Sequence, residues 1–305
     1  MDFNYLMKPS FFFFVIRVLI MFMNKKALSL ALAASISIFS HAQTKFNETE
    51  QAVIDRYWTF RMEVTCAETD DEAVAALDSY KEKHAEEVSN LGEEAALLLD
   101  SLIAMERYNY LYVFVGEDKE SRPPFELLRK KIRKYLENKK DSEVTPYILL
   151  CYADITTYYM SYSIKDIILN GMTVKKYQER AIEQGKTFSP AMLNLSTWYS
   201  YSPKIFGGSK EQTRIWLLKA LENARTDAET FFAKLAYSQF LFEMKEFEES
   251  ARQLDDAERL CPQSKRVKLL KEQNALGLSL NDYNKKRSKL LKSADDYKKK
   301  NNIKE

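Results

Sequence analysis

The sequence predicts an all-α fold built from stacked pairs of helices. Glycine and proline each occur only seven times in 305 residues, while Leu, Ala, Lys and Glu are abundant. Few turn-forming residues and many good helix formers are typical of a helical chain. Amphipathic segments also recur in pairs, and the corresponding alanines Ala181, Ala220 and Ala257 are 39 and 37 residues apart. Together these features predict about five helix–turn–helix pairs and a C-terminal capping helix.

Residues 1–42 are predicted to be a leader. A basic start at 23–26 precedes an apolar run of thirteen residues at 27–39, and small residues at 40–42 flank a cleavage point before Gln43. A second apolar tract lies upstream, so residues 1–22 are either a start-site extension or part of a leader that stays uncleaved as an anchor. The cleaved form predicts an exported protein, soluble in a bacterial periplasm, and the uncleaved form predicts membrane contact through the leader alone.

The segment 43–143 is predicted to contain two divergent helical hairpins. The first comprises residues 47–66 and 71–90, and the second comprises residues 92–115 and 124–138. These pairs have the length and amphipathic spacing of helical hairpins, with a turn between their members.

The segment 144–264 is predicted to hold three helix pairs of a more regular kind. Thr145-Pro146 and Ser189-Pro190 each combine an N-cap residue with proline in the first helical turn, which is a typical helix start. The third pair is residues 231–264, which divide into two amphipathic helices and stop at Pro262. Small residues at Ser238, Ser250 and Ala257 allow its two helices to approach closely. Larger residues fill the space between them, namely Tyr237, Leu241, Phe247, Leu254 and Leu260.

The order of small and large residues in 231–264, and its length of 34 residues, resemble a tetratricopeptide repeat (TPR). This resemblance implies a right-handed α-solenoid whose concave face binds partners rather than catalysing a reaction. The stretch Pro203 to Gly208, followed by a second helix of the repeat, is also similar to exported bacterial TPR proteins, including the periplasmic TPR partners of TRAP-type transporters. Gly207-Gly208 before a helix could hold a phosphate, but an inter-helix turn explains the glycines better.

The segment 265–305 is predicted to be a charged capping helix and tail. Its apolar residues recur at three-, four- and seven-residue steps, which gives one apolar stripe on a strongly charged helix. The stripe contains Leu280, Tyr283, Leu290, Ala294 and Tyr297. A polar outer face suits the terminal repeat of a solenoid.

Charge and cysteine content narrow the function classes. The chain has a net charge of +2, and without residues 1–42 it has 42 basic and 43 acidic residues, so the predicted mature chain has no electrostatic case for binding nucleic acid. Cys66, Cys151 and Cys261 lie in separate predicted pairs, and three buried apolar thiols are the favoured interpretation. Export would permit a disulfide, and an odd count leaves at least one thiol unpaired unless chains cross-link.

Catalytic motifs are missing from the sequence, which predicts a non-enzyme without a cofactor or a metal. The mature segment has a single histidine, His84, whose pairing with Glu87 one turn later favours a surface contact over a metal site. The sequence lacks HExxH, GxSxG, P-loop and GxGxxG patterns.

The first helix of each TPR pair lines the concave groove, so the resemblance implies candidate residues for partner binding. These are Phe232, Leu235, Gln239, Phe242 and Glu243 in the 231–264 unit, Leu193, Thr197, Ser200 and Tyr201 in the preceding unit, and Asp154, Thr157 and Tyr158 in the unit before it. They would form a mixed aromatic and polar cleft. Alternatively, several of them pack against the tail helix or neighbouring repeats.

The sequence supports three hypotheses about function. The favoured hypothesis is an exported TPR-like scaffold or adaptor that binds a protein or peptide in its concave groove. The alternative is a periplasmic component that binds a small molecule or assists an envelope transporter, which predicts a closed pocket instead of an open groove. A third possibility is an enzyme using a carboxylate such as Asp154 with nearby tyrosines. The sequence leaves the oligomeric state open.

Overall fold

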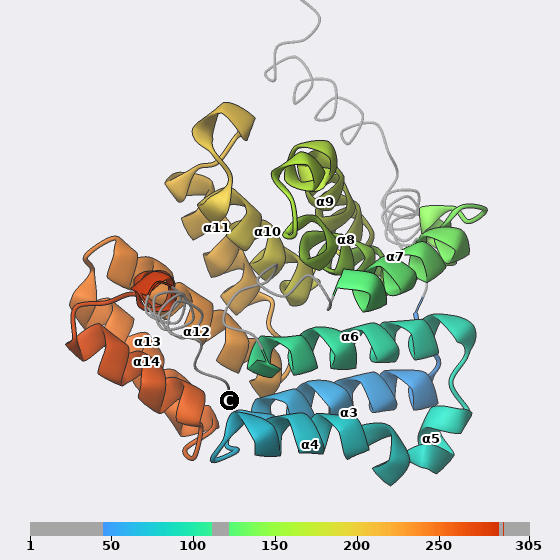
Figure 1. The fold of residues 1–305 in the computed structure, drawn as a ribbon, viewed down its shortest axis with the longest axis horizontal. Helices are drawn as coiled ribbons and strands as arrows, with labels where there is room; N and C mark the ends of the chain where they lie inside the picture. Colours follow the sequence, from blue (N-terminus) through green and yellow to red (C-terminus); the bar gives the residue numbers. More distant parts are fainter. Residues whose placement is uncertain (1–44, 112–121, 287–288, 290–305) are drawn as a thin grey trace, which may run out of the picture. The chain divides into compact units, whose positions relative to one another are not determined.

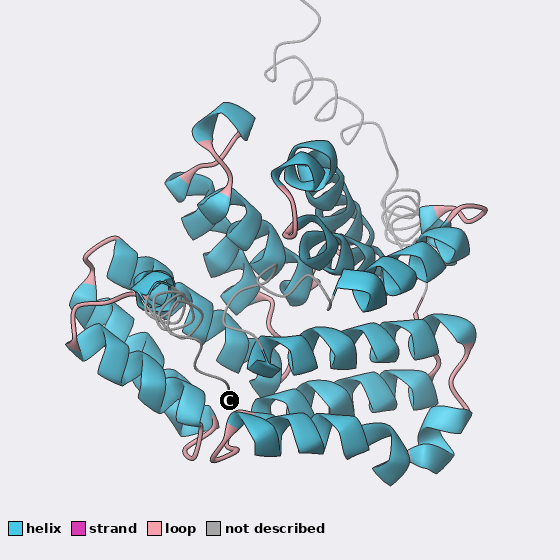
Figure 2. Cartoon of the chain, in the orientation of Figure 1, coloured by secondary structure: helices cyan, strands magenta, loops and turns pink. Residues whose placement is uncertain are grey.

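The computed structural model describes residues 45–111, 122–286 and 289, and every regular element within these ranges is helical (Figure 2). The expected all-α fold is therefore confirmed for this part of the chain. The predicted leader at 1–42, most of the predicted turn at 116–123 and the tail from 290 onward lie outside the described residues.

Within each described range, the helices follow one another with short connections (Figure 1). Their bounds are α3 (Glu48–Val64), α4 (Asp70–Lys83), α5 (Ala85–Ser89), α6 (Glu93–Leu111), α7 (Arg122–Leu136), η3 (Asp141–Glu143), α8 (Pro146–Met160), α9 (Ile164–Gln184), α10 (Ser189–Tyr201), η4 (Lys204–Phe206), α11 (Lys210–Glu222), α12 (Asp227–Glu243), α13 (Phe247–Leu260) and α14 (Lys265–Ala275).

Side-chain caps explain where several of these helices begin. Ser163, Ser209, Thr226 and Ser264 are the N-caps of α9, α11, α12 and α14, and each hydroxyl accepts a hydrogen bond from the backbone N–H three residues later. Each bond satisfies one of the amides that a helix leaves unpaired in its first turn.

Consecutive helices pack as pairs in the second half of the chain, where α8 packs against α9, α10 against α11, and α12 against α13. The α12–α13 pair lies within the segment that gave the clearest repeat pattern. Its small residues are at the interface: Ser238 and Ala257 are fully buried, and the Ser250 hydroxyl donates to the Ser238 carbonyl oxygen at 2.8 Å. The small side chains thus bring the two backbones close together.

The N-terminal helices pack in a different order. Helix α4 packs chiefly against α6. Its contact with α3, which the sequence predicted as its partner, is smaller. The predicted capping helix is also divided, because α14 ends at Ala275 and the chain becomes helical again at residue 280. Gly277 in the break has φ +74°, a left-handed conformation that interrupts a helix readily.

The turn after α10 depends on two glycines. Gly207 has φ +98°, and a Cβ atom at Gly208 would lie 1.8 Å from the Ser202 carbonyl oxygen. Any larger side chain at position 208 would therefore collide with the backbone. The glycines serve chain reversal here, in agreement with the structural interpretation of the Gly-Gly pair.

The first helices of the pairs form a closed series of contacts. Helix α3 contacts α6, α6 contacts α8, α10 contacts α12, and α12 returns to α3. A hydrogen bond from Asn194 to Asp154 links α10 to α8. Beside this contact, the C-terminal end of α3 is bonded to the start of α14: the Lys265 amide donates to the Thr65 carbonyl at 2.8 Å, and the hydroxyls of Thr65 and Ser264 are 2.8 Å apart. Helices far apart in sequence are thereby joined.

Close helix packing at α13 predicts a position-specific response to added volume. Ala257→Leu is expected to lower the free energy of unfolding by about 1–3 kcal/mol, because a fully buried position has no room for the larger side chain. Ala251→Leu makes the same change at an exposed position of α13 and is expected to stay within about 0.5 kcal/mol. Urea unfolding followed by circular dichroism measures both. Equal stability of the two variants would contradict the packing described for this pair.

Candidate functional site

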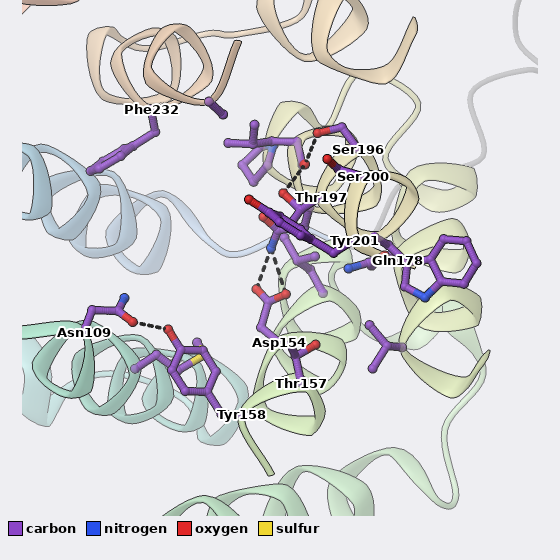
Figure 3. A pocket seen from close by; sticks show the side chains of 18 of the residues that line it. Asn109, Asp154, Thr157, Tyr158, Gln178, Ser196, Thr197, Ser200, Tyr201 and Phe232 are labelled. Carbon is purple, nitrogen blue, oxygen red and sulfur yellow. Dashed lines mark hydrogen bonds between the residues drawn. The ribbon is translucent and has the colours of Figure 1, made fainter. Parts of the chain in front are cut away.

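A cavity of about 960 Å³ lies inside the closed series of helices (Figure 3). Its wall combines side chains from α3, α6, α8, α9, α10, η4, α11, α12 and α14, together with Leu280. Most of this wall is apolar, and Phe232 of α12, Leu193 of α10 and Leu270 of α14 contribute to it. The volume is in the range of pockets that enclose most of the surface of a compact ligand.

One polar group in the cavity is the Asp154–Asn194 pair. The Asn194 side-chain amide donates to both carboxylate oxygens of Asp154, at 2.8 and 2.9 Å. Burial raises the pKa of Asp154 to about 7, and the hydrogen bond from Asn194 and the charge of Arg61 oppose this only in part. The carboxyl group therefore changes charge near neutral pH while facing the cavity.

A second polar pair lies on α6 and α8. The Tyr158 hydroxyl donates to the Asn109 side-chain oxygen at 2.6 Å, as Figure 3 shows. Burial, followed by the nearby charge of Glu106, raises the pKa of Tyr158 well above its ordinary value. The phenol consequently keeps its proton throughout the physiological range and serves as a neutral hydrogen-bonding group.

A buried ion pair closes the wall between α3 and α6. Arg61 Nε lies 2.6 Å from Glu106 Oε2, and the Glu106 side chain is only 2% exposed. Arg266 of α14 approaches the other carboxylate oxygen at 3.8 Å. The guanidinium of Arg61 also lies 4.3 Å from the centroid of the Phe232 ring, so a cation–π contact joins α3 to α12.

Gln178 of α9 is a buried polar residue in the wall of the cavity. The residue is 4% exposed, and its Oε1 is buried with no hydrogen-bond partner among the described residues. An unpaired buried carbonyl oxygen is costly, so this part of the wall carries an energetic cost in the fold.

The structure brings most of the predicted groove residues together around this cavity. The residues on its wall are Phe232, Leu235, Gln239, Glu243, Leu193, Thr197, Ser200, Tyr201, Asp154, Thr157 and Tyr158. Phe242 is elsewhere: its ring packs 5.1 Å from the ring of Phe247, and both line a separate cavity of about 520 Å³ between α12, α13 and α14. Gln239 also stabilises the fold, because its Oε1 accepts a hydrogen bond from the Leu280 amide at 2.8 Å.

Sequence reasoning missed the contributions of α3, α6 and α9. Arg61, Glu106, Asn109 and Gln178 all line the cavity, but they lie outside the segment with the clearest repeat pattern. Arginine and glutamate 45 residues apart give no local signal of an ion pair. The signal that could have been used is the position of Glu106 directly after the apolar run Leu102–Met105, since a charge on the buried face of a helix requires a partner.

The described ranges hold no group of three or more His, Cys, Asp or Glu residues placed to bind a metal ion. His84 follows α4 as its C-cap, and its Nδ1 lies 3.7 Å from the Glu87 carboxylate. Among the helices of the described segments, none has the length and apolar character needed to cross a membrane.

The comparisons with known proteins found no relative of this chain. No protein-family model, curated protein or solved structure matches this chain. The function is therefore argued from the residues of the cavity.

The raised pKa of Asp154 predicts a pH dependence of stability. A carboxyl group in an unfolded chain titrates near ~3.9, whereas Asp154 in the folded chain titrates at about 7. Between these values the folded chain binds a proton that the unfolded chain has lost, so stability falls as the pH rises. Asp154→Asn cannot ionise, and its stability relative to the wild type is expected to rise by about 2.6 kcal/mol between pH 5 and pH 8.

Chemical denaturation at several pH values measures this difference. Asp78→Asn, which alters an exposed carboxylate, is the control and is expected to follow the wild type. Parallel pH profiles of stability for Asp154→Asn and the wild type would contradict the raised pKa of Asp154.

The Arg61–Glu106 pair predicts a large cost for removing one partner. Arg61→Met leaves the Glu106 charge buried with only the more distant Arg266, and we expect a loss of about 3 kcal/mol of stability. Lys81→Met breaks the exposed Lys81–Asp100 pair and is expected to cost less than about 1 kcal/mol. Thermal or urea unfolding compares the two variants, and similar losses in both would contradict the buried character of the Arg61–Glu106 pair.

Proposed function

We propose that this protein is a non-enzymatic, TPR-like binding protein that holds a compact, mainly apolar ligand in the cavity lined by α3, α6, α8, α10 and α12. The observation that carries the proposal is the closed series of contacts among these five helices around about 960 Å³ of space. An open groove exposes an extended partner along its length, whereas an encircled cavity suits a ligand that fits within it. The cavity is partly open to solvent, but its encirclement by five helices favours the small-molecule alternative over the adaptor interpretation.

The chemistry of the wall narrows the ligand class. Phe232, Leu235 and Leu193 offer apolar surface to the cavity. Asp154 adds a carboxyl group that titrates at about 7 and already accepts from Asn194. These features suit a ligand with an apolar body and at least one hydrogen-bond donor, such as a hydroxyl or an amine.

A short peptide segment of a partner protein is the second candidate. Tyr201 is 64% exposed and lines the cavity, and it lies on the same helix as Thr197 and Leu193. An aromatic side chain at the edge of an apolar cavity is a frequent anchor for a peptide. Under this interpretation the cavity receives a few apolar side chains of the partner while the remaining partner residues stay outside.

A non-catalytic role is supported by how the polar groups are used. Asp154 is bonded to an amide, Tyr158 to an amide, and Glu106 to an arginine. None of these three pairs joins a nucleophile to a general base, which is the arrangement that covalent catalysis requires. The pairs instead satisfy buried polar atoms and leave the apolar wall for binding.

The remaining parts of the proposal concern architecture and location. The 34-residue segment 231–264, with its buried Ser238, Ser250 and Ala257, supports a TPR-type helix pair within a right-handed solenoid. The basic start, apolar run and small residues before Gln43 support export to a periplasm. An exported binding protein would encounter its ligand in the envelope.

The proposal predicts a bound ligand that depends on the cavity wall. Native mass spectrometry of gently purified protein is expected to show a non-covalent adduct that denaturation releases. Phe232→Ala and Tyr201→Ala should each weaken retention by about tenfold or more, which corresponds to about 1.4 kcal/mol, because both side chains line the cavity. Tyr201 is mostly exposed, so Tyr201→Ala is expected to fold normally, and weaker retention in this variant would not be due to misfolding.

Phe242→Ala is the matched control, because it makes the same change on α12 outside the cavity. It is expected to retain the adduct at the wild-type level. A peptide adduct would identify the second candidate. Equal occupancy in all three variants, or an empty wild-type protein that shows no saturable binding of an apolar fluorescent probe, would contradict a ligand site in the cavity.

A further inference from the structure

Two cysteines from opposite ends of the described chain lie side by side. The sulfur atoms of Cys66 and Cys261 are 3.3 Å apart, although the residues are separated by 195 positions in the sequence. Both are present as free thiols, as is Cys151. The two thiols had been placed in separate predicted helix pairs, and the contact between α3 and the α12–α14 segment brings them together.

The backbone positions of Cys66 and Cys261 allow their sulfur atoms to move closer together. Cys66 lies in the turn after α3, and Cys261 is the C-cap of α13, so neither is inside a helix. A disulfide has an S–S distance of about 2.05 Å, which requires the two sulfurs to move together by about 1.3 Å. Side-chain rotation and small shifts in two non-helical segments can supply this movement without disturbing α3 or α13.

We propose that Cys66 and Cys261 form an intramolecular disulfide that locks the contact between α3 and the α13–α14 connection. The oxidant is a disulfide-bearing partner, either a small-molecule disulfide or an oxidoreductase in its disulfide form. The Cys66 thiolate attacks a sulfur of the oxidant, forming a mixed disulfide and releasing one thiol. The Cys261 sulfur then attacks Cys66 Sγ, the second oxidant thiol leaves, and the oxidant has gained two electrons and two protons.

The surroundings assign the first attack to Cys66. Cys66 is partly exposed, whereas Cys261 is 7% exposed and belongs to a cluster with Phe231, Leu254 and Val267. Burial, together with the hydrogen bond to Cys261, raises the pKa of Cys66 to about 11. The thiolate is therefore scarce at neutral pH, so oxidation is slow without an efficient oxidant. Once formed, the disulfide would be mostly buried, which limits the access of a reductant.

The position of the bond gives it a structural role. The adjacent contacts, Lys265 to Thr65 and Thr65 to Ser264, already hold the same two segments together through hydrogen bonds. A covalent link across 195 residues would restrict the unfolded chain strongly, because the entropy that a cross-link removes grows with the length of the closed loop. Oxidation would thus keep the closed series of helices intact.

The test uses the full chain under native conditions. The purified protein is incubated with oxidised glutathione or with reductant, free thiols are alkylated, and peptides are mapped by mass spectrometry without reduction. The oxidised sample is expected to contain a peptide joining Cys66 to Cys261 in the monomer, with Cys151 free. The melting temperature of this sample should exceed that of the reduced sample by about 10 °C.

Cys151→Ala is the matched control and should keep both the linked peptide and the rise in melting temperature. Cys66→Ala, at a partly exposed position, should lose both. Alkylation of Cys66 and Cys261 in folded, oxidant-treated wild-type protein, or linkage only between different chains, would overturn the proposal. The readout does not involve a ligand, so it stands or falls independently of the proposed function.

Discussion

The contact between α3 and the α12–α14 segment holds together helices that lie at opposite ends of the described chain. Within it, the Arg61 guanidinium pairs with the buried Glu106 carboxylate and lies over the Phe232 ring. Transferring both charges out of water is unfavourable, and the pair is tolerated because its partners meet at hydrogen-bonding distance. The arginine is positioned only when α3, α6 and α12 are all in place, so the cavity wall and the closure of the helices depend on the same interaction.

Closure changes what the inner face of the helices can do. In an open solenoid, the side chains of the first helices would face solvent along a groove. Here Phe232, Leu193 and Asp154 face a shared cavity, and its polar atoms are paired with one another to a large extent. Burial disfavours the charged carboxylate of Asp154 more than Asn194 and Arg61 favour it, which is why Asp154 keeps its proton to about pH 7.

Local patterns in the sequence predicted the helices, and the TPR resemblance supplied many of the positions that line the cavity. Small residues at Ser238, Ser250 and Ala257 identified a close helix pair, and the resemblance put Phe232, Leu235 and Gln239 on the inner face of its first helix. The resemblance also implied Phe242, which instead packs against Phe247 in the separate cavity between α12, α13 and α14. Arg61, Glu106 and Gln178 could not be predicted, because their placement follows from contacts between distant helices. The approach of Cys66 to Cys261 has the same origin, since no local pattern encodes a meeting across 195 residues.

Closure between distant helices is the central claim, and a zero-length cross-link tests it most directly. Lys265 Nζ lies 2.8 Å from Glu68 Oε1, with side chains that are 42% and 70% exposed. Carbodiimide treatment of the native monomer should therefore join these two residues by an amide bond that peptide mapping detects. The Lys271–Glu258 pair, at 2.7 Å between neighbouring helices, serves as the internal control for reactivity. Formation of both links supports the closed arrangement, whereas formation of the Lys271–Glu258 link alone would contradict it.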